Sequence, residues 1–237
     1  MKKKVGNKIS AENANWSFSG KTPKNFDKHI NKSIPLYKWT HQIGLEVADF
    51  FLANNSLTYD IGCSTGVFAK KLAERTKNKK VNIIGIDEIP EMIKKAKFNC
   101  KKNKNINLYK ADITKINLKK NNLTTSFFTM SFIKPSKRQI VFNKVFKSLN
   151  WGGGFLFFDK VRAPDARFQD MMSQIYNEFK ISQGFTPDEI LSKSSSLKGV
   201  LEPFSSKANI MLAKRAGFKD VMTIFKFLNF EGFLAIK

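Results

Sequence analysis

The chain has 237 residues, which suits one large domain with a substantial buried core, and its apolar share of 42% excludes global disorder. No stretch is apolar for long enough to span a bilayer, and no apolar segment follows the charged start as in a signal peptide, so a cytoplasmic protein is expected. Two cysteines far apart argue against a disulfide framework and against a metal site.

The net charge of +23 comes mainly from lysine. Clustered lysines bind phosphates, so contact with a nucleic acid is one explanation of the charge. Lysine, asparagine, isoleucine and phenylalanine are all abundant, however, and these amino acids share A/T-rich codons. A skewed genome would produce this composition without selection for a basic surface, and this second explanation is favoured.

Residues 1–52 are predicted to be an extension that covers a ligand site in a main domain at 53–237. Residues 1 to about 30 are polar, which indicates a loop-like segment with Trp16 and Phe18 as anchors. From Lys38 to Leu52 apolar residues recur at helical spacing, so this stretch predicts a helix.

Strands and helices then alternate along the chain. The pattern predicts strands at 57–61, 81–87, 106–112, 124–132 and 152–160, and helices at 67–75, from Pro90 and from Pro135. The end of the chain predicts a helix from about Ser205 to Arg215 and two strands, 220–228 and 230–237, joined by a tight turn. Regular alternation implies right-handed crossovers and a parallel sheet covered on both faces, which is a doubly wound α/β fold.

A helical insertion is predicted at about 165–200, over the mouth of the site. Its first helix carries an apolar stripe that is interpreted as core rather than as a cofactor-binding face: Phe168, Met171, Met172, Ile175, Tyr176 and Phe179. The stretch "TPDE" at 186–189 is a capping box with proline in the first turn, and it predicts the start of a second helix.

The stretch "DIGCSTG" at 60–66 places an acid and two glycines where the first strand of the alternating series turns into a helix. Gly62 and Gly66 would let the backbone approach a ligand closely. A dinucleotide fingerprint has a third glycine where Ser64 stands, and the carboxylate of Asp60 would repel a pyrophosphate. The turn therefore predicts a ligand with a cationic amino group and no phosphate.

Two further acids end the next two predicted strands. Asp87 can accept hydrogen bonds from both hydroxyls of a ribose, and Asp112 can accept from an adenine amino group. An adenine, a ribose and an amino acid together indicate S-adenosylmethionine as the cofactor. No general base is identified, because His29 and His41 lie outside the motifs and are interpreted as surface or packing residues.

These motifs resemble, in order, those of the class I methyltransferases: "DIGCSTG", "GIDEIPEMI", "KADI", "LNWGGGFLFF" and the final hairpin "AGFKDV…FEGFLAIK". Within that superfamily the chain is most similar to the carboxy-S-adenosylmethionine synthase family, nearly end to end, through "WSF", "INKSIPLY", "PSKRQ", "EFKISQGFTPDEI" and "FLNFEGFLAIK". The resemblance implies a Rossmann-like, mostly parallel seven-stranded sheet with an antiparallel C-terminal hairpin. It also implies a homodimer.

The resemblance further implies an activity and a site. In the family, a carboxylate lost from prephenate is captured by the sulfonium ligand through an ylide, and a partner enzyme uses the product to carboxymethylate the wobble uridine of certain tRNAs. Matched position by position, the cofactor contacts would be Tyr37, Gly62, Cys63 and Ser64, with Asp87 and Glu88 at the ribose and Asp112 and Ile113 at the adenine.

Two positions depart from the family pattern. The family holds the product carboxylate with an arginine where this chain has Ser194, and it has an asparagine where this chain has Phe127. Serine supplies neither the bidentate fork nor the fixed charge of arginine. Lys193 is a neighbouring cation, although helical geometry would turn it about 100° away. Arg162 and Arg167, just past the fifth strand, are candidates for holding an anionic substrate.

Three functions remain open from the sequence. The favoured one is methyl transfer from S-adenosylmethionine to an unidentified acceptor. The second is carboxy-S-adenosylmethionine synthesis from prephenate, with Lys193 or another cation in place of the missing arginine. The third is a non-catalytic RNA-binding protein that exploits the positive charge on this scaffold.

Overall fold

The computed structural model describes residues 2–20 and 22–237, and it confirms the predicted doubly wound fold. The seven-stranded sheet has the order β5-β4-β3-β6-β7-β9-β8, and β9 is antiparallel to both of its neighbours. The strands of this sheet are β3 (Leu57–Ile61), β4 (Asn82–Asp87), β5 (Ile106–Lys110), β6 (Asn121–Phe127), β7 (Leu149–Lys160), β8 (Asp220–Phe227) and β9 (Phe230–Ile236).

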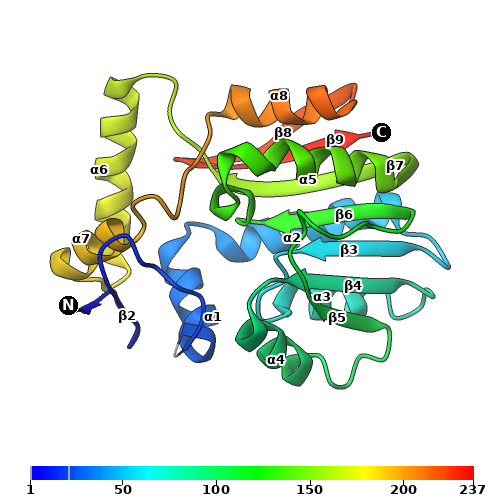
Figure 1. The fold of residues 1–237 in the computed structure, drawn as a ribbon, viewed down its shortest axis with the longest axis horizontal. Coiled ribbons are helices and arrows are strands. Elements are labelled where there is room, and N and C mark those ends of the chain that lie inside the picture. The colour runs from blue at the N-terminus through cyan, green and yellow to red at the C-terminus, as the bar shows by residue number, and fades with distance from the viewer. Residues whose placement is uncertain (1, 21) are drawn as a thin grey trace.

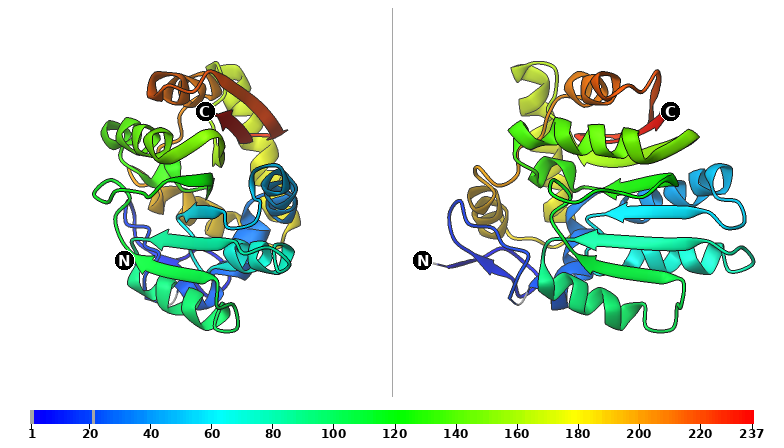
Figure 2. Two further views of the ribbon diagram at one scale, coloured as in Figure 1. Left: turned by 90° about the vertical axis from the view of Figure 1, so that its right-hand side faces the viewer. Right: turned by 45° about the vertical axis from the view of Figure 1, so that its right-hand side comes forward.

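Helices lie on both faces of this sheet and beyond one of its ends (Figure 2). They are α1 (Thr22–Ser33), α2 (Tyr37–Phe51), α3 (Val67–Arg75), α4 (Pro90–Asn99), α5 (Pro135–Ser148), α6 (Ala166–Ser182), α7 (Pro187–Ser196) and α8 (Ser206–Ala216). The predicted capping box at the start of α7 is confirmed, with Thr186 and Glu189 bonding each other's backbone. In the described part of the chain no helix combines the length and hydropathy needed to cross a bilayer.

The core has two layers because side chains alternate along the central strand β7. Phe155 and Phe157 pack on one face, against α5 and α8, whereas Leu156 and Phe158 pack on the other face, against α2 and α3. All four side chains are fully buried. A strand buried on both faces carries a continuous apolar run, as this one does.

The N-terminal segment is more ordered than the sequence predicts. The loop-like interpretation of residues 1–30 is wrong, because β1 (Lys3–Lys4) pairs with β2 (Ser10–Ala11) and α1 begins at Thr22. The helix was missed because its buried face mixes Phe26 with polar Thr22 and His29, which breaks the apolar periodicity. Trp16 is buried and packs with Phe18, so the expected anchors are confirmed.

Two strand limits also differ from the prediction. The strand expected at 124–132 ends at Phe127, because Phe128 has a φ of 56° and the chain then forms a short 3-10 helix, η1 (Met130–Phe132). A residue in the left-handed region cannot continue a strand. The strand expected at 152–160 starts earlier, at Leu149, since the residues before the glycines pair with β6 across an irregularity.

The apolar stripe of α6 joins the core only in part: Tyr176 packs against Phe230 of the core, whereas other members of the stripe are exposed, contrary to the prediction. The helix stands beyond one end of the sheet, next to α7, the N-terminal hairpin and α1 (Figure 1), and none of its residues is buried. Phe168, Met171 and Ile175 are 44%, 53% and 43% exposed, respectively. Periodicity identified one apolar face of the helix, but it could not show that Phe168, Met171 and Ile175 on that face remain exposed.

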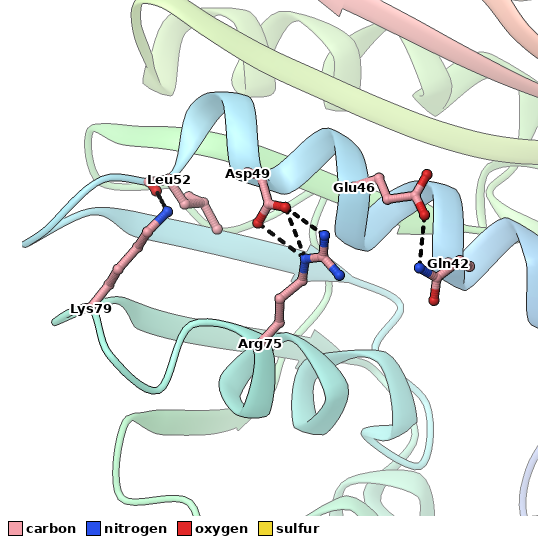
Figure 3. A network of polar contacts seen from close by, with 6 residues as sticks. All are labelled: Gln42, Glu46, Asp49, Leu52, Arg75 and Lys79. Atoms are coloured by element: carbon pink, nitrogen blue, oxygen red, sulfur yellow. Dashed lines mark hydrogen bonds and ion pairs between the residues drawn. The ribbon is translucent and has the colours of Figure 1, made fainter.

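A polar network joins α2 to α3 at the surface (Figure 3). The guanidinium of Arg75 donates to both carboxylate oxygens of Asp49, and the Nη2–Oδ2 distance is 2.5 Å. These bonds from Arg75 hold the pKa of the Asp49 carboxyl below its ordinary value. Lys79 donates to the carbonyl of Leu52 at 2.7 Å. Because both partners of the ion pair are exposed, it contributes at most about 1 kcal/mol to stability.

Arg138 is a buried cation that holds together the chain segments next to the site. Its guanidinium donates to the carbonyls of Ile133 at 2.9 Å, Ser131 at 3.1 Å and Glu202 at 2.6 Å. It also lies 4.2 Å from the ring centroid of Phe204. Arginine suits this position because its planar fork can reach several carbonyls at once.

We expect Arg138→Met to lower the free energy of unfolding by about 3 kcal/mol, because it leaves three carbonyls without their charged donor. Arg138→Lys should recover less than half of this loss, since one ammonium cannot reach all three acceptors. Urea unfolding followed by circular dichroism measures both values. Arg215→Met, at an exposed position in α8, is the control and should change stability by less than about 0.5 kcal/mol. Equal stability of Arg138→Met and Arg215→Met would contradict this role.

Candidate active site

A cavity of about 970 Å³ lies at the carboxyl ends of the parallel strands, where ligands bind in doubly wound sheets. Its lining comes from the turn after β3, the ends of β4, β6 and β7, and the helices α1, α2, α6 and α7. Trp16 and Phe18 add the N-terminal segment to the wall. The volume is at the upper end of the range for small-molecule sites, so a second ligand can fit beside a cofactor.

The glycine turn presents its backbone to this cavity. Gly62 and Ser64 have φ angles of 72° and 51°, and a Cβ on Gly62 would collide with the side chain of Thr129. The Ser64 N–H donates to Asp87 at 2.9 Å, which ties the turn to the end of β4. Gly66 does not line the cavity. It allows close packing of α3 on α4, because a Cβ there would lie 2.9 Å from the sulfur of Cys100.

Asp60 is a buried carboxyl at the start of the turn and lines the cavity. Burial raises its pKa to about 7, although Thr125 donates a hydrogen bond to Oδ1 at 3.1 Å and opposes the rise. A cationic amino group beside Asp60 would stabilise the ionised form. Cys63 is also buried at the cavity wall, and burial raises the pKa of its thiol well above the ordinary value.

Each carboxylate oxygen of Asp87 accepts one backbone hydrogen bond and keeps a lone pair for a ligand. Oδ2 accepts from the Ser64 N–H, and Oδ1 accepts from the Ile89 N–H at 2.9 Å. Burial raises the pKa of this carboxyl, while the two backbone bonds oppose the shift. Each oxygen can accept a further bond from a ribose hydroxyl. The neighbouring Glu88 is exposed at the cavity wall.

Asp112 and Ile113 follow β5 at the same edge of the sheet and both line the cavity. Partial burial alone would raise the pKa of Asp112, but hydrogen bonds from the backbone and hydroxyl of Thr114 outweigh it and hold the pKa below its ordinary value. Oδ2 of Asp112 lies 3.8 Å from Lys115. Throughout residues 2–20 and 22–237, no three His, Cys, Asp or Glu side chains gather in a metal-binding group.

An aromatic wall closes the cavity on the side of α2. Tyr37 and His41 have ring centroids 4.5 Å apart, and the ring of His41 lies 4.8 Å from that of Phe127. Phe127 stacks in turn on Phe158 at 5.2 Å. Burial raises the pKa of Tyr37, and it lowers the pKa of His41 to about 3, so both side chains are neutral at pH 7. Phe127 therefore makes this part of the site apolar.

A second region of the same cavity is cationic. Lys160, which ends β7, and Lys180 of α6 lie over the ring of Tyr176, with their ammonium nitrogens 4.7 and 4.4 Å from its centroid. Burial lowers the pKa of Lys160 to about 8, with a contribution from Arg162. Burial also lowers the pKa of Lys180 to about 8, with a contribution from Lys160. These lysines therefore repel one another across the cavity.

The other substrate candidates fall into two groups. Lys193 points to the cavity and lies over the ring of Trp16, while Ser194 and Arg162 are exposed side chains at its wall. Burial lowers the pKa of Lys193, and Lys180 adds to the shift. Arg167 does not line the cavity, because its guanidinium lies over the ring of Phe168 at 5.3 Å on the exposed side of α6.

The sequence pointed to the cofactor turn but not to several other residues of the cavity wall. These are Trp16, His29, His41, Lys160 and Lys180. His29 and His41 are buried packing residues, which agrees with one of the two expectations for them. For Lys160 a signal was present, since it ends the fifth strand at the edge where ligands bind. Trp16 and His29 gave no such signal, because they approach α7 only through the folding of the N-terminal segment.

Comparisons with known proteins agree with this geometry. The chain matches the methyltransferase domain family over residues 53–230. It is 36% identical over 223 residues to the carboxy-S-adenosyl-L-methionine synthase of Staphylococcus epidermidis, which covers 94% of this chain and 97% of the relative. The chain belongs to the carboxy-S-adenosyl-L-methionine synthase family. The protein of that name from Nautilia profundicola is 31% identical over 238 residues, 100% of each chain.

Solved structures support the fold. A methyltransferase from Aquifex aeolicus aligns with a TM-score of 0.59 at 16% identity, over 90% of this chain and 97% of that one. Human N-acetylserotonin methyltransferase in complex with SAM aligns with a TM-score of 0.55 at 18% identity, over 90% of this chain and 61% of that one. This protein is thus an S-adenosylmethionine-dependent transferase of the class I methyltransferase fold.

The residues present fit S-adenosylmethionine. Asp60 supplies a buried anion for the amino group, Asp87 has lone pairs free for the ribose, and the turn at Gly62 lines the cavity between them. Asp112 is ionised and accessible at the end of β5, as an acceptor for the adenine amino group must be. The bound cofactor supplies an electrophilic sulfonium with three carbon substituents.

Proposed function

We propose that this protein makes carboxy-S-adenosyl-L-methionine from S-adenosylmethionine and the dianion prephenate. The observation that carries the proposal is the cationic part of the cavity. Lys160, Arg162, Lys180 and Lys193 line it, and none of them has an ion-pair partner within residues 2–20 and 22–237. Partly buried, unpaired ammonium groups cost stability, and an anionic second substrate would supply the missing countercharge.

In the proposed reaction a carbon–carbon bond forms between the methyl carbon of S-adenosylmethionine and one carboxylate carbon of prephenate. The bond between that carboxylate and the prephenate ring breaks. The ring hydroxyl and one methyl hydrogen leave together as water, and phenylpyruvate remains. In this scheme Asp60 and Asp87 orient the cofactor, while the lysines bind and orient the carboxylates of prephenate next to it.

Methyl transfer to another acceptor is the second candidate, and Ser194 in place of the family arginine favours it. The cationic lining favours the synthase, because a methyl acceptor must be nucleophilic and does not need to be a dianion. Both relatives named above are carboxy-S-adenosyl-L-methionine synthases, which agrees with the synthase proposal. Use of the product in tRNA wobble modification, a homodimeric assembly and a cytoplasmic location are further proposals that rest on the resemblance.

Incubation of the full chain with S-adenosylmethionine and prephenate labelled with ¹³C in its ring carboxylate tests the proposal. We expect labelled carboxy-S-adenosylmethionine and an equal amount of phenylpyruvate by mass spectrometry. Unlabelled prephenate with ¹³C-bicarbonate is the control and should transfer no label. Demethylated cofactor without any carboxylated product would overturn the synthase proposal and support methyl transfer.

A further inference from the structure

Two buried hydrogen-bond donors and the partly buried Lys193 meet where the N-terminal segment, α1 and α7 come together. Trp16 and His29 are only 7% and 4% exposed, and their rings stack with centroids 5.8 Å apart. The ammonium of Lys193 lies over the Trp16 ring. All three side chains line the cavity.

None of these donors is satisfied within the described chain. Trp16 Nε1 and His29 Nε2 are buried without a hydrogen-bond partner in residues 2–20 and 22–237, and Lys193 forms no ion pair there. Buried polar groups normally find partners, so each unsatisfied one requires an explanation. The indole of Trp16 can donate a hydrogen bond but cannot accept one. The same holds for the Lys193 side chain in its charged form.

The hydrogen bonding of His29 makes its free nitrogen a donor as well. The side-chain amide of Asn7 donates to Nδ1 of His29 at 3.2 Å. Burial lowers the pKa of His29 to about 3, with a contribution from Lys193, so the ring is neutral at pH 7. A neutral ring that accepts at Nδ1 carries its proton at Nε2. Trp16 and His29 therefore offer two N–H donors, Lys193 offers an ammonium when it is protonated, and none of these three groups then offers a free acceptor.

We propose that Trp16, His29 and Lys193 form a carboxylate-binding subsite, which holds the carboxylate of carboxy-S-adenosylmethionine. A carboxylate provides two oxygens with about four lone pairs, enough for all three donors. The neighbouring position in α7 is Ser194, where the family's arginine would stand. The N-terminal segment and Lys193 thus supply the anion recognition that Ser194 cannot. This inference rests on the proposed function, because it assigns the carboxylate to that product.

Equilibrium binding of carboxy-S-adenosylmethionine and of S-adenosylmethionine to the full chain, by titration calorimetry, tests the subsite. The two probes differ by the carboxylate, so the ratio of their dissociation constants measures the contribution of the carboxylate to binding. We expect the preference for the carboxylated ligand to fall about 30-fold in Lys193→Met and about fivefold in Trp16→Phe and in His29→Phe. Affinity for S-adenosylmethionine should stay the same, which excludes misfolding. Trp151→Phe, at a residue that is 91% exposed, is the matched control.

The indole N–H signals in nitrogen-15 NMR give a second readout. The chain has three tryptophans, and Trp16→Phe assigns one signal by its loss. The carboxylated ligand should move the Trp16 signal, and S-adenosylmethionine should move it much less. An unchanged preference in all three variants, or no preference in the wild type, overturns the subsite.

Turnover separates this inference from the proposed function. Conversion of prephenate with an unchanged binding preference in the variants would support the synthase proposal and contradict the subsite. A preference that depends on the three residues, without any conversion of prephenate, would support the subsite and remove the synthase.

Discussion

Replacing Asp87 with asparagine is expected to raise the dissociation constant of S-adenosylmethionine about 100-fold. The carboxylate already accepts from Ser64 and Ile89, and its remaining lone pairs face the cavity. Two hydrogen bonds from ribose hydroxyls to a charged acceptor are worth about 3 kcal/mol together. Asparagine has one acceptor oxygen, and its amide group would also oppose one of the two backbone N–H donors. Titration calorimetry measures the loss.

The fold should survive this change. Burial raises the pKa of Asp87, so the charged form is already disfavoured there, and a neutral amide relieves part of that cost. Asp49→Asn is the control. It removes one charge from the network on the outer side of α2 (Figure 3) and should leave cofactor binding unchanged. Equal cofactor affinity of the two variants would show that Asp87 does not bind the ribose.

Replacing Lys180 with methionine should lower kcat/KM for prephenate about 50-fold, mainly through KM. The lysine contributes one charged donor to the cationic part of the cavity, and such a bond is worth about 2 kcal/mol. Methionine keeps the length and the contact with Tyr176. Removing a partly buried, unpaired charge should not lower stability. Lys219→Met, at an exposed residue before β8, is the control, and an unchanged kcat/KM in Lys180→Met would contradict the assignment.

The same lysines predict a pH dependence. Lys160 and Lys180 have pKa values lowered to about 8, so both are ammonium groups below pH 8 and lose their charge above it. Prephenate should therefore bind well at about pH 7.5, and its KM should rise at least about tenfold by about pH 9.5. A bound dianion raises the pKa values of both lysines, so in the complex they lose their charge at a higher pH.

Other groups titrate elsewhere in the profile. Asp60 has a pKa of about 7, and Asp159, which also lines the cavity, has a pKa of about 6. Protonation of these two carboxylates therefore affects the acid side of the pH profile. No lysine of the cationic region contacts the cofactor in this arrangement, so the pH dependence of cofactor affinity should be the same in Lys180→Met as in the wild type. Lys180→Arg keeps its charge at about pH 9.5 and should show a shallower rise in KM. A KM that does not change with pH would contradict the role of the lysines.

The sequence predicted the fold and the cofactor half of the site for the same physical reason. Alternating strands and helices place all carboxyl ends of the parallel strands at one edge of the sheet. Asp60 lies one residue before the end of β3, Asp87 ends β4 and Asp112 follows β5, so local patterns suffice to bring them together.

The cationic half of the site could be identified only from the folded structure. Lys160, Lys180 and Lys193 lie on three different elements, and Trp16 reaches Lys193 across more than half of the sequence. Periodicity marked the apolar stripe of α6 but could not show which layer, if any, packs against it. The carboxyl ends of parallel strands meet at one edge of the sheet because of the regular geometry of the sheet. The positions of the N-terminal segment, α6 and α7 depend instead on long-range packing, which leaves no local pattern in the sequence.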